Sequence, residues 1–564
     1  MSETATLSPA APQQAPVNAG QPKPGTQRTV AQFVLEQLRL WNVERIYGVI
    51  GDANLSLLDE LGKQNDIRYI PCRHEGGAAL MASAEAKLTG RLAVCLATSG
   101  PGIANLLNGL ADAAMDRSPV LALAGQVETS KYGTHSKQYI DQQKLSAAVS
   151  DRSELLAHPD ALPQLMEQLL VHSLTQGQVT LLSIPKDLYA GQVRGEPAPC
   201  GSHLYQPLYA SDTETEELVQ LIEAAQRPVL LIGRGSASVR EQVKTVAEKL
   251  NAAVVTTLPA RPLFPNDHVL YAGGLGQAGS EASSVLLSEA DLIVMLGATW
   301  WPDDYVPMQA RIVQIDQNRE AIGIGHPLHK GIVGDLSQFV PKLSDRLAAA
   351  ASKDRSPWLA RVKETTAGWK RRIEAEASSD GTPIPPQRIM KLIAEHASED
   401  AVLAVDTGDL TLWFNRIFQA KPSQEILVSG RWRTLGFALP AAIAAQLAYP
   451  NRQVIAIAGD GGAVQTIMEF QTAVEQQLPI VWIVCNNGAY AMEKHWMEAA
   501  GMNKLGSEIR NPDFALLAQA CGGAGTKAAT AAEFAQQLQQ ALASRKPTLI
   551  EATTACIPVP HTKI

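Results

Sequence analysis

Residues 454–496 read VIAIAGDGGAVQTIMEFQTAVEQQLPIVWIVCNNGAYAMEKHW, and this stretch predicts a strand, a helix and a second strand. Val454–Ala458 and Ile480–Cys485 are short apolar runs typical of buried strands. The apolar residues between them recur at helical spacing: Ile467, Phe470, Val474 and Leu478. In a parallel sheet, such a unit brings both strand ends to one edge, where α/β sheets bind ligands. We therefore expect Asp460 and Asn487 to lie close together.

The residues that follow these two strands have the chemistry of a phosphate and magnesium site. Gly459, Gly461 and Gly462 would let backbone amides approach a phosphate where the helix begins. Asp460 and Asn487 offer hard oxygen ligands for Mg²⁺, which protein and phosphate oxygens usually share. Taken alone, Asp460 could equally be a helix N-cap.

The composition excludes several classes of protein. The chain has 564 residues, 46% apolar residues and a net charge of −8, which is typical of a globular protein with several domains. The negative balance and the lack of a basic run argue against nucleic-acid binding. No stretch would span a bilayer, so we expect no membrane partner. Six cysteines without CxxC spacing indicate reduced thiols and a cytoplasmic protein.

The spacing of the GDG and NN motifs, with 24 residues between them, resembles the signature of thiamine diphosphate (ThDP) enzymes. The resemblance covers essentially Thr29 to the C-terminus. It implies that Asp460, Asn487 and the backbone carbonyl of Ala489 hold Mg²⁺ against the diphosphate of the cofactor.

Two further segments of this region are similar to family motifs. The resemblance implies that Gly408 and Asp409, in the run Asp406-Thr407-Gly408-Asp409, form a second loop on the diphosphate side. It also implies that Leu435, in TLGFALP, lies under the bent cofactor. Plain core packing is a compatible interpretation of Leu435.

Residues 73–102 read RHEGGAALMASAEAKLTGRLAVCLATSGPG and resemble the pyrimidine-binding domain of pyruvate oxidases and acetohydroxyacid synthases. The resemblance implies that Glu75 is catalytic, bonding N1′ of the aminopyrimidine and favouring its imino tautomer. It also places Gly100 and Pro101 in a loop beside the cofactor. In isolation, Glu75 would be a solvated or capping carboxylate. Because the family's site forms between two subunits, we expect a homodimer or homotetramer.

The middle of the chain carries a series of glycine turns in the order found in FAD-binding domains of the same enzymes. The resemblance implies that Gly233, Gly276 and Asp316 contact FAD. Flavin-free relatives keep this fold, so FAD stays an open expectation, and Asp316 could instead cap a turn.

Several residues depart from the pattern of oxidases and synthases. In Lys137-Gln138-Tyr139 only Gln138 matches their Phe-Gln-Glu, and it is a candidate catalytic residue. Glu493 resembles the acid/base glutamate of pyruvate decarboxylases, and Asp52 resembles their active-site aspartate, so both are catalytic candidates as well. Arg431 and Arg433 stand where small or apolar residues are usual. They are surface charges, or they recognise a second anionic group on the substrate.

Alternating strand and helix patterns predict an α/β protein with three doubly wound parallel-sheet domains. We expect a pyrimidine-binding domain over residues 29–193, a central domain with FAD as candidate ligand over 213–347, and a diphosphate- and Mg²⁺-binding domain over 386–557. Residues 1–28 are rich in Ala, Pro, Gln, Thr and Gly and are expected to be disordered.

The expected activity is decarboxylation of a 2-oxo acid, most simply pyruvate, with ThDP and Mg²⁺. Oxidation of the remaining fragment, as in a pyruvate oxidase, ranks narrowly first. Carboligation as in an acetolactate synthase, protonation as in a non-oxidative decarboxylase, and acyl transfer are the alternatives. An inactive scaffolding homologue is the alternative outside enzymes.

Overall fold

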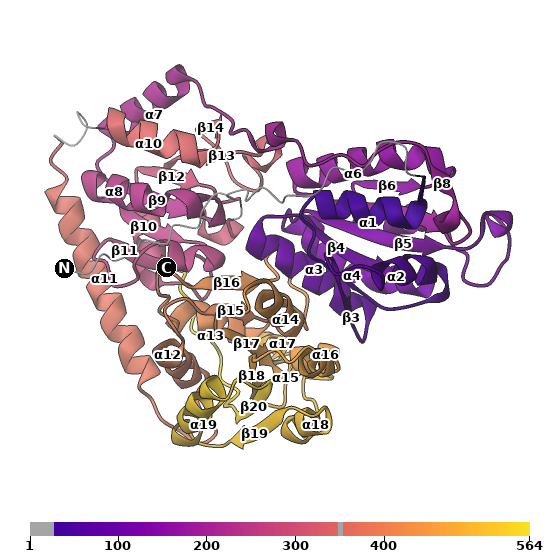
Figure 1. Cartoon of the computed structure of the whole chain (residues 1–564). Helices are drawn as coiled ribbons and strands as arrows, with labels where there is room; N and C mark the ends of the chain where they lie inside the picture. The colour runs from indigo at the N-terminus through magenta and orange to yellow at the C-terminus, as the bar shows by residue number, and fades with distance from the viewer. Residues whose placement is uncertain (1–26, 300, 348–352, 564) are drawn as a thin grey trace, which may run out of the picture.

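Three six-stranded parallel sheets, each flanked by helices, form the molecule (Figure 1). The computed structural model describes residues 27–299, 301–347 and 353–563. The predicted fold class, three doubly wound α/β domains, is confirmed. Most of the segment expected to be disordered lies outside the described residues. At its end, however, Arg28 belongs to β1 (Arg28–Thr29), which pairs antiparallel with β8 (Gln192–Val193).

The sheet of the first domain has the strand order β3-β2-β4-β5-β7-β6. Its strands are β2 (Arg45–Gly48), β3 (Arg68–Pro71), β4 (Ala93–Ala97), β5 (Val120–Gln126), β6 (Arg152–Leu155) and β7 (Val179–Pro185). One face packs on α1 (Val30–Leu40), α2 (Leu55–Leu61) and α6 (Leu162–Gln176), and the other on α3 (Glu75–Thr89) and α4 (Pro101–Met115). A short helix, α5 (Gln142–Ser146), precedes β6.

The central domain has the strand order β11-β10-β9-β12-β13-β14. Its strands are β9 (Pro228–Ile232), β10 (Ala253–Thr256), β11 (Tyr271–Gly274), β12 (Leu292–Leu296), β13 (Arg311–Asp316) and β14 (Lys330–Val333). Its helices are α7 (Asp212–Ala224), α8 (Arg240–Leu250), α9 (Glu281–Glu289) and α10 (Leu336–Arg346), and the long helix α11 (Ser356–Ala377) leads to the third domain.

The third domain has the strand order β16-β15-β17-β18-β20-β19. Its strands are β15 (Val402–Val405), β16 (Glu425–Val428), β17 (Val454–Gly459), β18 (Val481–Asn486), β19 (Ala524–Ala528) and β20 (Thr548–Thr553). Its helices are α12 (Pro386–His396), α13 (Asp409–Ile417), α14 (Ala438–Ala448), α15 (Asp460–Thr466), α16 (Glu469–Glu475), α17 (Ala491–Ala499), α18 (Phe514–Ala520) and α19 (Ala531–Ala543).

The predicted strand pair of this domain is correct, but the single helix expected between the strands is wrong. β17 and β18 are parallel neighbours, whereas α15 and α16 are separate short helices. The second one begins at Glu469, which is 1% exposed and accepts hydrogen bonds from the backbone of Arg73 and His74 in the first domain. A buried carboxylate needs such donors, so this tertiary contact accompanies the break.

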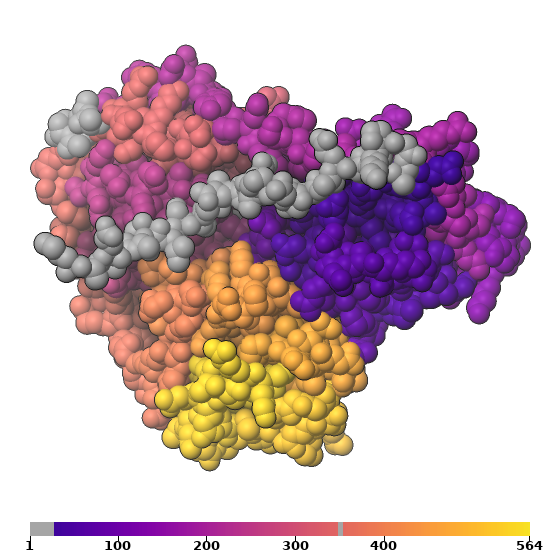
Figure 2. Space-filling view, in the orientation of Figure 1, coloured from indigo at the N-terminus to yellow at the C-terminus, as the bar shows by residue number. Residues whose placement is uncertain are grey.

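The first and third domains share one hydrophobic core cluster through α3 and α14. On the surface, the indigo first domain lies directly against the orange part of the third domain (Figure 2). Both helices are rich in alanine, and α14 is buried along almost its whole length. Small side chains let two helix backbones approach closely, and a helix that is apolar all round is a buried one. The contact therefore fixes the first domain against the third.

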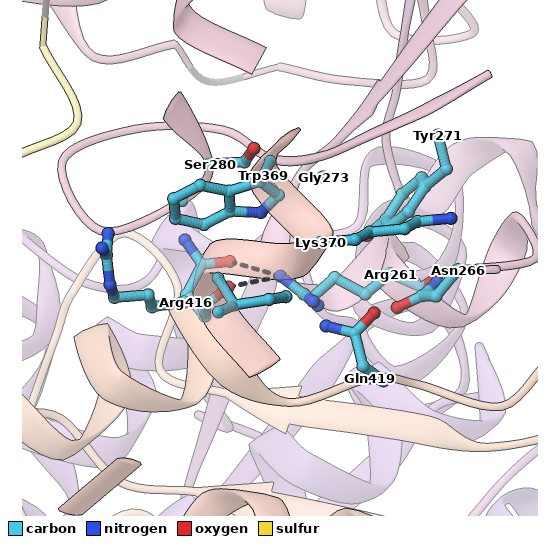
Figure 3. Close-up of a pocket in the computed structure, with 13 residues that line it drawn as sticks. Arg261, Asn266, Tyr271, Gly273, Ser280, Trp369, Lys370, Arg416 and Gln419 are labelled. Carbon is cyan, nitrogen blue, oxygen red and sulfur yellow. Dashed lines mark hydrogen bonds between the residues drawn. The ribbon is translucent and has the colours of Figure 1, made fainter. Parts of the chain in front are cut away.

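The central domain is attached to the third through a buried arginine (Figure 3). Arg261 is 2% exposed, and its guanidinium donates to the backbone carbonyls of Asn415 and Phe418 at the end of α13. The adjoining cavity leaves about 10 Å³ for the centre of a water-sized sphere. That is room for about one water molecule, so the two domains are closely packed around Arg261.

We predict that Arg261→Ala destabilises the junction between these two domains. The substitution leaves two buried carbonyls without their donor, which costs on the order of 2–4 kcal/mol. Thermal unfolding should show a lower midpoint for the central or third domain. Arg372→Ala is the control, because Arg372 is 56% exposed and forms surface ion pairs, which contribute little. Equal midpoints for both variants would contradict the prediction.

Candidate functional site

The GDG and NN motifs meet at the carboxyl ends of β17 and β18. Asp460 accepts hydrogen bonds from the Gly488 N–H at 2.7 Å and from the Asn511 side chain at 2.7 Å. Asn487 precedes Gly488, and its side-chain oxygen accepts from the Ala489 N–H at 3.1 Å. Asp460, Asn487 and Ala489, the three predicted metal ligands, therefore lie in one small region of the structure.

The glycines of the motif permit close packing at the start of α15. A Cβ on Gly461 would lie 2.4 Å from the ring of Tyr490, and one on Gly462 would lie 2.9 Å from the carboxylate of Asp406. Gly459, the third glycine, ends β17. Because glycine has no side chain, Gly461 and Gly462 leave room at this edge of the sheet for the ring of Tyr490 and the carboxylate of Asp406.

Asp406 organises the loop that carries Leu435. Its carboxylate accepts from the backbone N–H of Thr407 at 2.8 Å, of Gly436 at 3.0 Å and of Phe437 at 3.3 Å. Burial raises the pKa of Asp406 to about 7, against the pull of these donors. Leu435 is partly buried directly before this anchor, so Asp406 holds it at the same edge as Asp460.

Asp409 and Glu493 bring further negative charge to this edge. Asp409 begins α13 directly after Gly408, which has φ +142°. Burial, followed by the nearby charge of Asp460 and then of Glu493, raises the pKa of Asp409 to about 6. Burial likewise raises the pKa of Asp460. Glu493 itself, on α17, is exposed.

The carboxylate, amide and carbonyl oxygens of this site fit a hard divalent cation as ligands. Among the described residues, the largest influences on the pKa values of Asp406, Asp409 and Asp460 include no cationic side chain. Buried carboxylates are costly without a positive partner. Within the described ranges, no three His, Cys, Asp or Glu side chains converge on one point. A cation held here would therefore also need amide, carbonyl and external oxygen ligands, as Mg²⁺ commonly does.

Glu75 begins α3 and is 9% exposed. Its Oε2 accepts a hydrogen bond from the Asn105 side chain at 2.9 Å. Its Oε1 lies 3.4 Å from where a Cβ on Gly102 would be. The predicted catalytic carboxylate therefore faces the start of α4, where Gly100 and Pro101 also lie.

Two other catalytic candidates lie around the same loop. A Cβ on Gly100, which has φ +66°, would be 2.7 Å from the backbone oxygen of Gln138. Asp52 is exposed and pairs with Lys186 at 3.0 Å. Lys186 directly follows β7, so Asp52 lies at the carboxyl edge of this sheet.

The two arginines that depart from the family pattern lie in a loop held by the first domain. Asp116 accepts from the backbone N–H of Gly430 and of Arg431, each at 2.8 Å. Arg433 adopts φ +54°, and burial lowers its pKa. The loop is thus attached by its backbone, and the side chain of Arg431 is exposed.

The glycine turns of the central domain pack tightly against other parts of the chain. A Cβ on Gly233 would lie 2.2 Å from the backbone oxygen of Gly297. Gly276 adopts φ +94°, which L side chains rarely adopt, and its carbonyl accepts from the hydroxyl of Thr562 at 2.8 Å. The close approach at Gly233 and the positive φ at Gly276 explain the two glycines without a ligand.

Two buried polar side chains of the central domain keep unused hydrogen-bonding capacity. Asp316 ends β13, and its Oδ1 caps the Asn318 N–H at 2.8 Å, while burial raises its pKa. His326 is 7% exposed, and neither ring nitrogen forms a hydrogen bond within the described ranges. These two side chains are the features that fit a polar ligand such as a nucleotide.

Sequence reasoning missed four residues that support the site: Asn105, Asp406, Glu469 and Asn511. Asp406 stood in a run assigned to the diphosphate side, and its role as a loop anchor had no local signal. Asn105 and Asn511 are distant in sequence from the carboxylates they contact. Glu469 lies between apolar positions of the expected helix, where polar residues are ordinary, so its tertiary contact had no local signal either.

Comparison with known proteins identifies all three domains. Family models of thiamine pyrophosphate enzymes match residues 28–145 (N-terminal TPP binding domain), 215–343 (central domain) and 406–552 (C-terminal TPP binding domain). The Bacillus subtilis protein YdaP, whose name assigns it thiamine pyrophosphate but no reaction, is 34% identical over 93% of this chain and 91% of its own length.

Two relatives carry the names of defined enzymes. A pyruvate oxidase of Lactiplantibacillus plantarum is 28% identical over 94% of this chain and 89% of its own. An acetolactate synthase of Mycobacterium bovis is 32% identical over 92% and 86%, respectively.

The raised pKa values of Asp406 and Asp409 predict a pH-dependent stability of the metal-free protein. Between about pH 4 and pH 7 the folded protein holds protons that the unfolded chain has released. The contribution of these two carboxylates to stability is therefore greatest below this window and falls as pH rises through it, by roughly 3–4 kcal/mol for each group. Thermal unfolding in the presence of a chelator measures this slope.

Mg²⁺ should reverse the slope, because it binds the deprotonated carboxylates. Mg²⁺ should raise the unfolding midpoint more near pH 8 than near pH 5. In the absence of metal, Asp409→Asn should make the unfolding midpoint depend less on pH. A metal-free Asp409→Asn variant whose midpoint depends on pH as steeply as that of the unaltered protein would contradict this account.

Proposed function

The chain belongs to the thiamine pyrophosphate enzyme family, and we propose that it decarboxylates a 2-oxo acid, most simply pyruvate, with ThDP and Mg²⁺. When bound, ThDP would supply a nucleophilic carbon for the keto group and an electron sink for the loss of carbon dioxide. The observation that carries the proposal is that one chain has both a buried Glu75 and a group of buried carboxylates around Asp460, whose pKa values are raised by burial.

The residues of the chain have separate tasks in this proposal. Glu75 would bond the aminopyrimidine and exchange a proton with it, since a buried carboxylate suits proton traffic. Asp460, Asn487 and the Ala489 carbonyl would hold Mg²⁺, with Gly408 and Asp409 beside the diphosphate. Leu435, anchored by Asp406, would support the cofactor from below.

Gln138, Asp52 and Glu493 are the candidates for contact with the substrate. Gln138 lies against Gly100, and Asp52 lies at the same edge. Glu493 is exposed beside the carboxylates of the third domain, so it can deliver or remove a proton once a second surface covers it. Gln138 and Asp52 would therefore act from the sheet edge of the first domain, and Glu493 from that of the third.

A second copy of the chain would complete the site. Large exposed apolar side chains flank the candidate residues at both edges: Ile50, Leu55, Ile140, Val464, Met468 and Trp496. Exposed apolar groups of this kind mark interaction surfaces. We propose that the first domain of one subunit meets the third domain of its partner in a homodimer or homotetramer, with the cofactor between them.

FAD is the candidate ligand of the central domain. Asp316 and His326 support this with their unused hydrogen-bonding capacity, and Gly233 and Gly276 are the turns that would approach the nucleotide. Oxidation of the acyl fragment, as in a pyruvate oxidase, remains the first choice. The exposed Glu493 and Asp52 favour protonation of the same fragment to an aldehyde as the second choice.

The remaining parts of the proposal concern the surroundings of the enzyme. No helix within the described ranges is both long and apolar enough to cross a membrane. The six cysteines are free, which supports a reducing, cytoplasmic location. The small-molecule substrate is the partner we propose, without nucleic acid or membrane.

The deciding experiment identifies the products that the purified protein forms from pyruvate. The visible spectrum of the same protein shows whether it binds flavin. Acetate that forms only with an artificial electron acceptor supports oxidation. Acetolactate or acetaldehyde without an acceptor overturns the ranking in favour of carboligation or protonation. No turnover of any 2-oxo acid with ThDP and Mg²⁺ present would point to an inactive scaffolding homologue.

We predict that Glu75→Gln lowers kcat by about 100-fold or more and changes ThDP affinity much less, since the amide cannot exchange a proton. Steady-state kinetics and a ThDP titration measure the two effects. Glu85→Gln is unsuitable as a control because Glu85 bonds Arg45 in the core. Glu60→Gln, in the same domain and bonded only near the surface, is the matched control and should retain full activity.

A further inference from the structure

We propose that Asn105 is a positioning residue that selects which oxygen of Glu75 acts on the cofactor. The inference rests on the proposed function and deepens it. Asn105 contacts Glu75 from the second turn of α4, whereas Glu75 begins α3. The contact therefore ties the orientation of the acid to the packing of two helices.

The two oxygens of Glu75 have different surroundings. Oε2 accepts from the Asn105 amide at 2.9 Å, the one hydrogen bond that its carboxylate receives in the part of the chain described. Oε1 faces Gly102, at 3.4 Å from where a Cβ would be. Oε2 is thus restrained, and Oε1 is the oxygen presented to the loop of Gly100 and Pro101.

The chemistry of an amide suits this task. A glutamate side chain has several rotatable bonds, and one fixed contact removes much of their freedom. Asn105 donates a hydrogen bond without carrying charge, so it does not neutralise the carboxylate as lysine or arginine would. Its amide is neither acidic nor basic near neutral pH, so it cannot compete with the aminopyrimidine for the proton of Glu75.

Asn108 provides a matched comparison on the same helix. It lies one turn after Asn105 and is similarly exposed. Its side chain bonds Trp432 at 2.8 Å and Thr434 at 3.0 Å, with no contact to Glu75. A general effect of losing an asparagine from α4 would appear in both variants, whereas loss of the Glu75 contact appears only at position 105.

The test compares Asn105→Ala, Asn105→Asp and Asn108→Ala with the unaltered protein. Crystal structures without cofactor show the conformation of Glu75, and isotope exchange at the thiazolium C2 of bound ThDP reports activation. We expect Glu75 to leave its present conformation in both position-105 variants. Exchange should slow by about 10- to 100-fold, as for a misplaced reactive group, with ThDP affinity changed by less than about 3-fold.

The outcomes separate this inference from the proposed function. If the unaltered protein fails to bind ThDP, the proposed function fails, while the cofactor-free structures still decide the role of Asn105. If the unaltered protein activates ThDP and Asn105→Ala exchanges at the same rate, the positioning role is overturned. An unmoved Glu75 in the cofactor-free Asn105→Ala structure overturns it as well.

Discussion

The packing of α3 on α14 is the constraint on which the rest of the site depends. Each helix begins at a candidate residue or next to one: α3 at Glu75, and α14 at Ala438, three residues after Leu435. Because both helices are largely alanine at the contact, they approach closely, and side-chain adjustment can absorb little error. Their contact therefore sets how Glu75 and the loop of Leu435 are placed relative to each other within one chain, and so how each subunit presents its two half-sites to a partner.

Buried charges strengthen this arrangement. Lys87, on α3, pairs with Asp112 at 2.6 Å and with Asp116 at 2.7 Å, and its side chain is 2% exposed. Asp116 in turn holds the backbone of the loop at Gly430, and the pull of Lys87 contributes to the lowered pKa of Asp116. Here cations satisfy the carboxylates, whereas the carboxylates around Asp460 lack them. The contrast separates a structural ion cluster from a site that is short of positive charge.

Much of the fold could be read from local patterns. Apolar runs such as Pro228–Ile232 and Leu292–Leu296 coincide with β9 and β12, because central parallel strands are buried on both faces and read as continuous apolar segments. The break between α15 and α16 could not be read in this way. It accompanies the contact of Glu469 with the first domain, almost 400 residues earlier, and periodicity carries no information about such a contact.

The site was predictable to the extent that its chemistry lies in contiguous motifs. Asp460 and Asn487 stand in one strand-helix-strand unit, so their proximity followed from topology. Asp406 and Asn105 act through neighbours that only the tertiary structure supplies, and neither has a distinctive local sequence. Resemblance supplied the role of Glu75, since a lone glutamate after a strand would not have indicated it.

The account requires Glu75 of one chain and Asp460 of another to act on one cofactor molecule. Mixing the inactive variants Glu75→Gln and Asp460→Ala tests this most directly. A mixed dimer would carry one site with both defects and one intact site. After subunit exchange, activity should recover to about one quarter of the unaltered enzyme. A mixture that stays inactive, although exchange of subunits is demonstrated, would contradict the shared site.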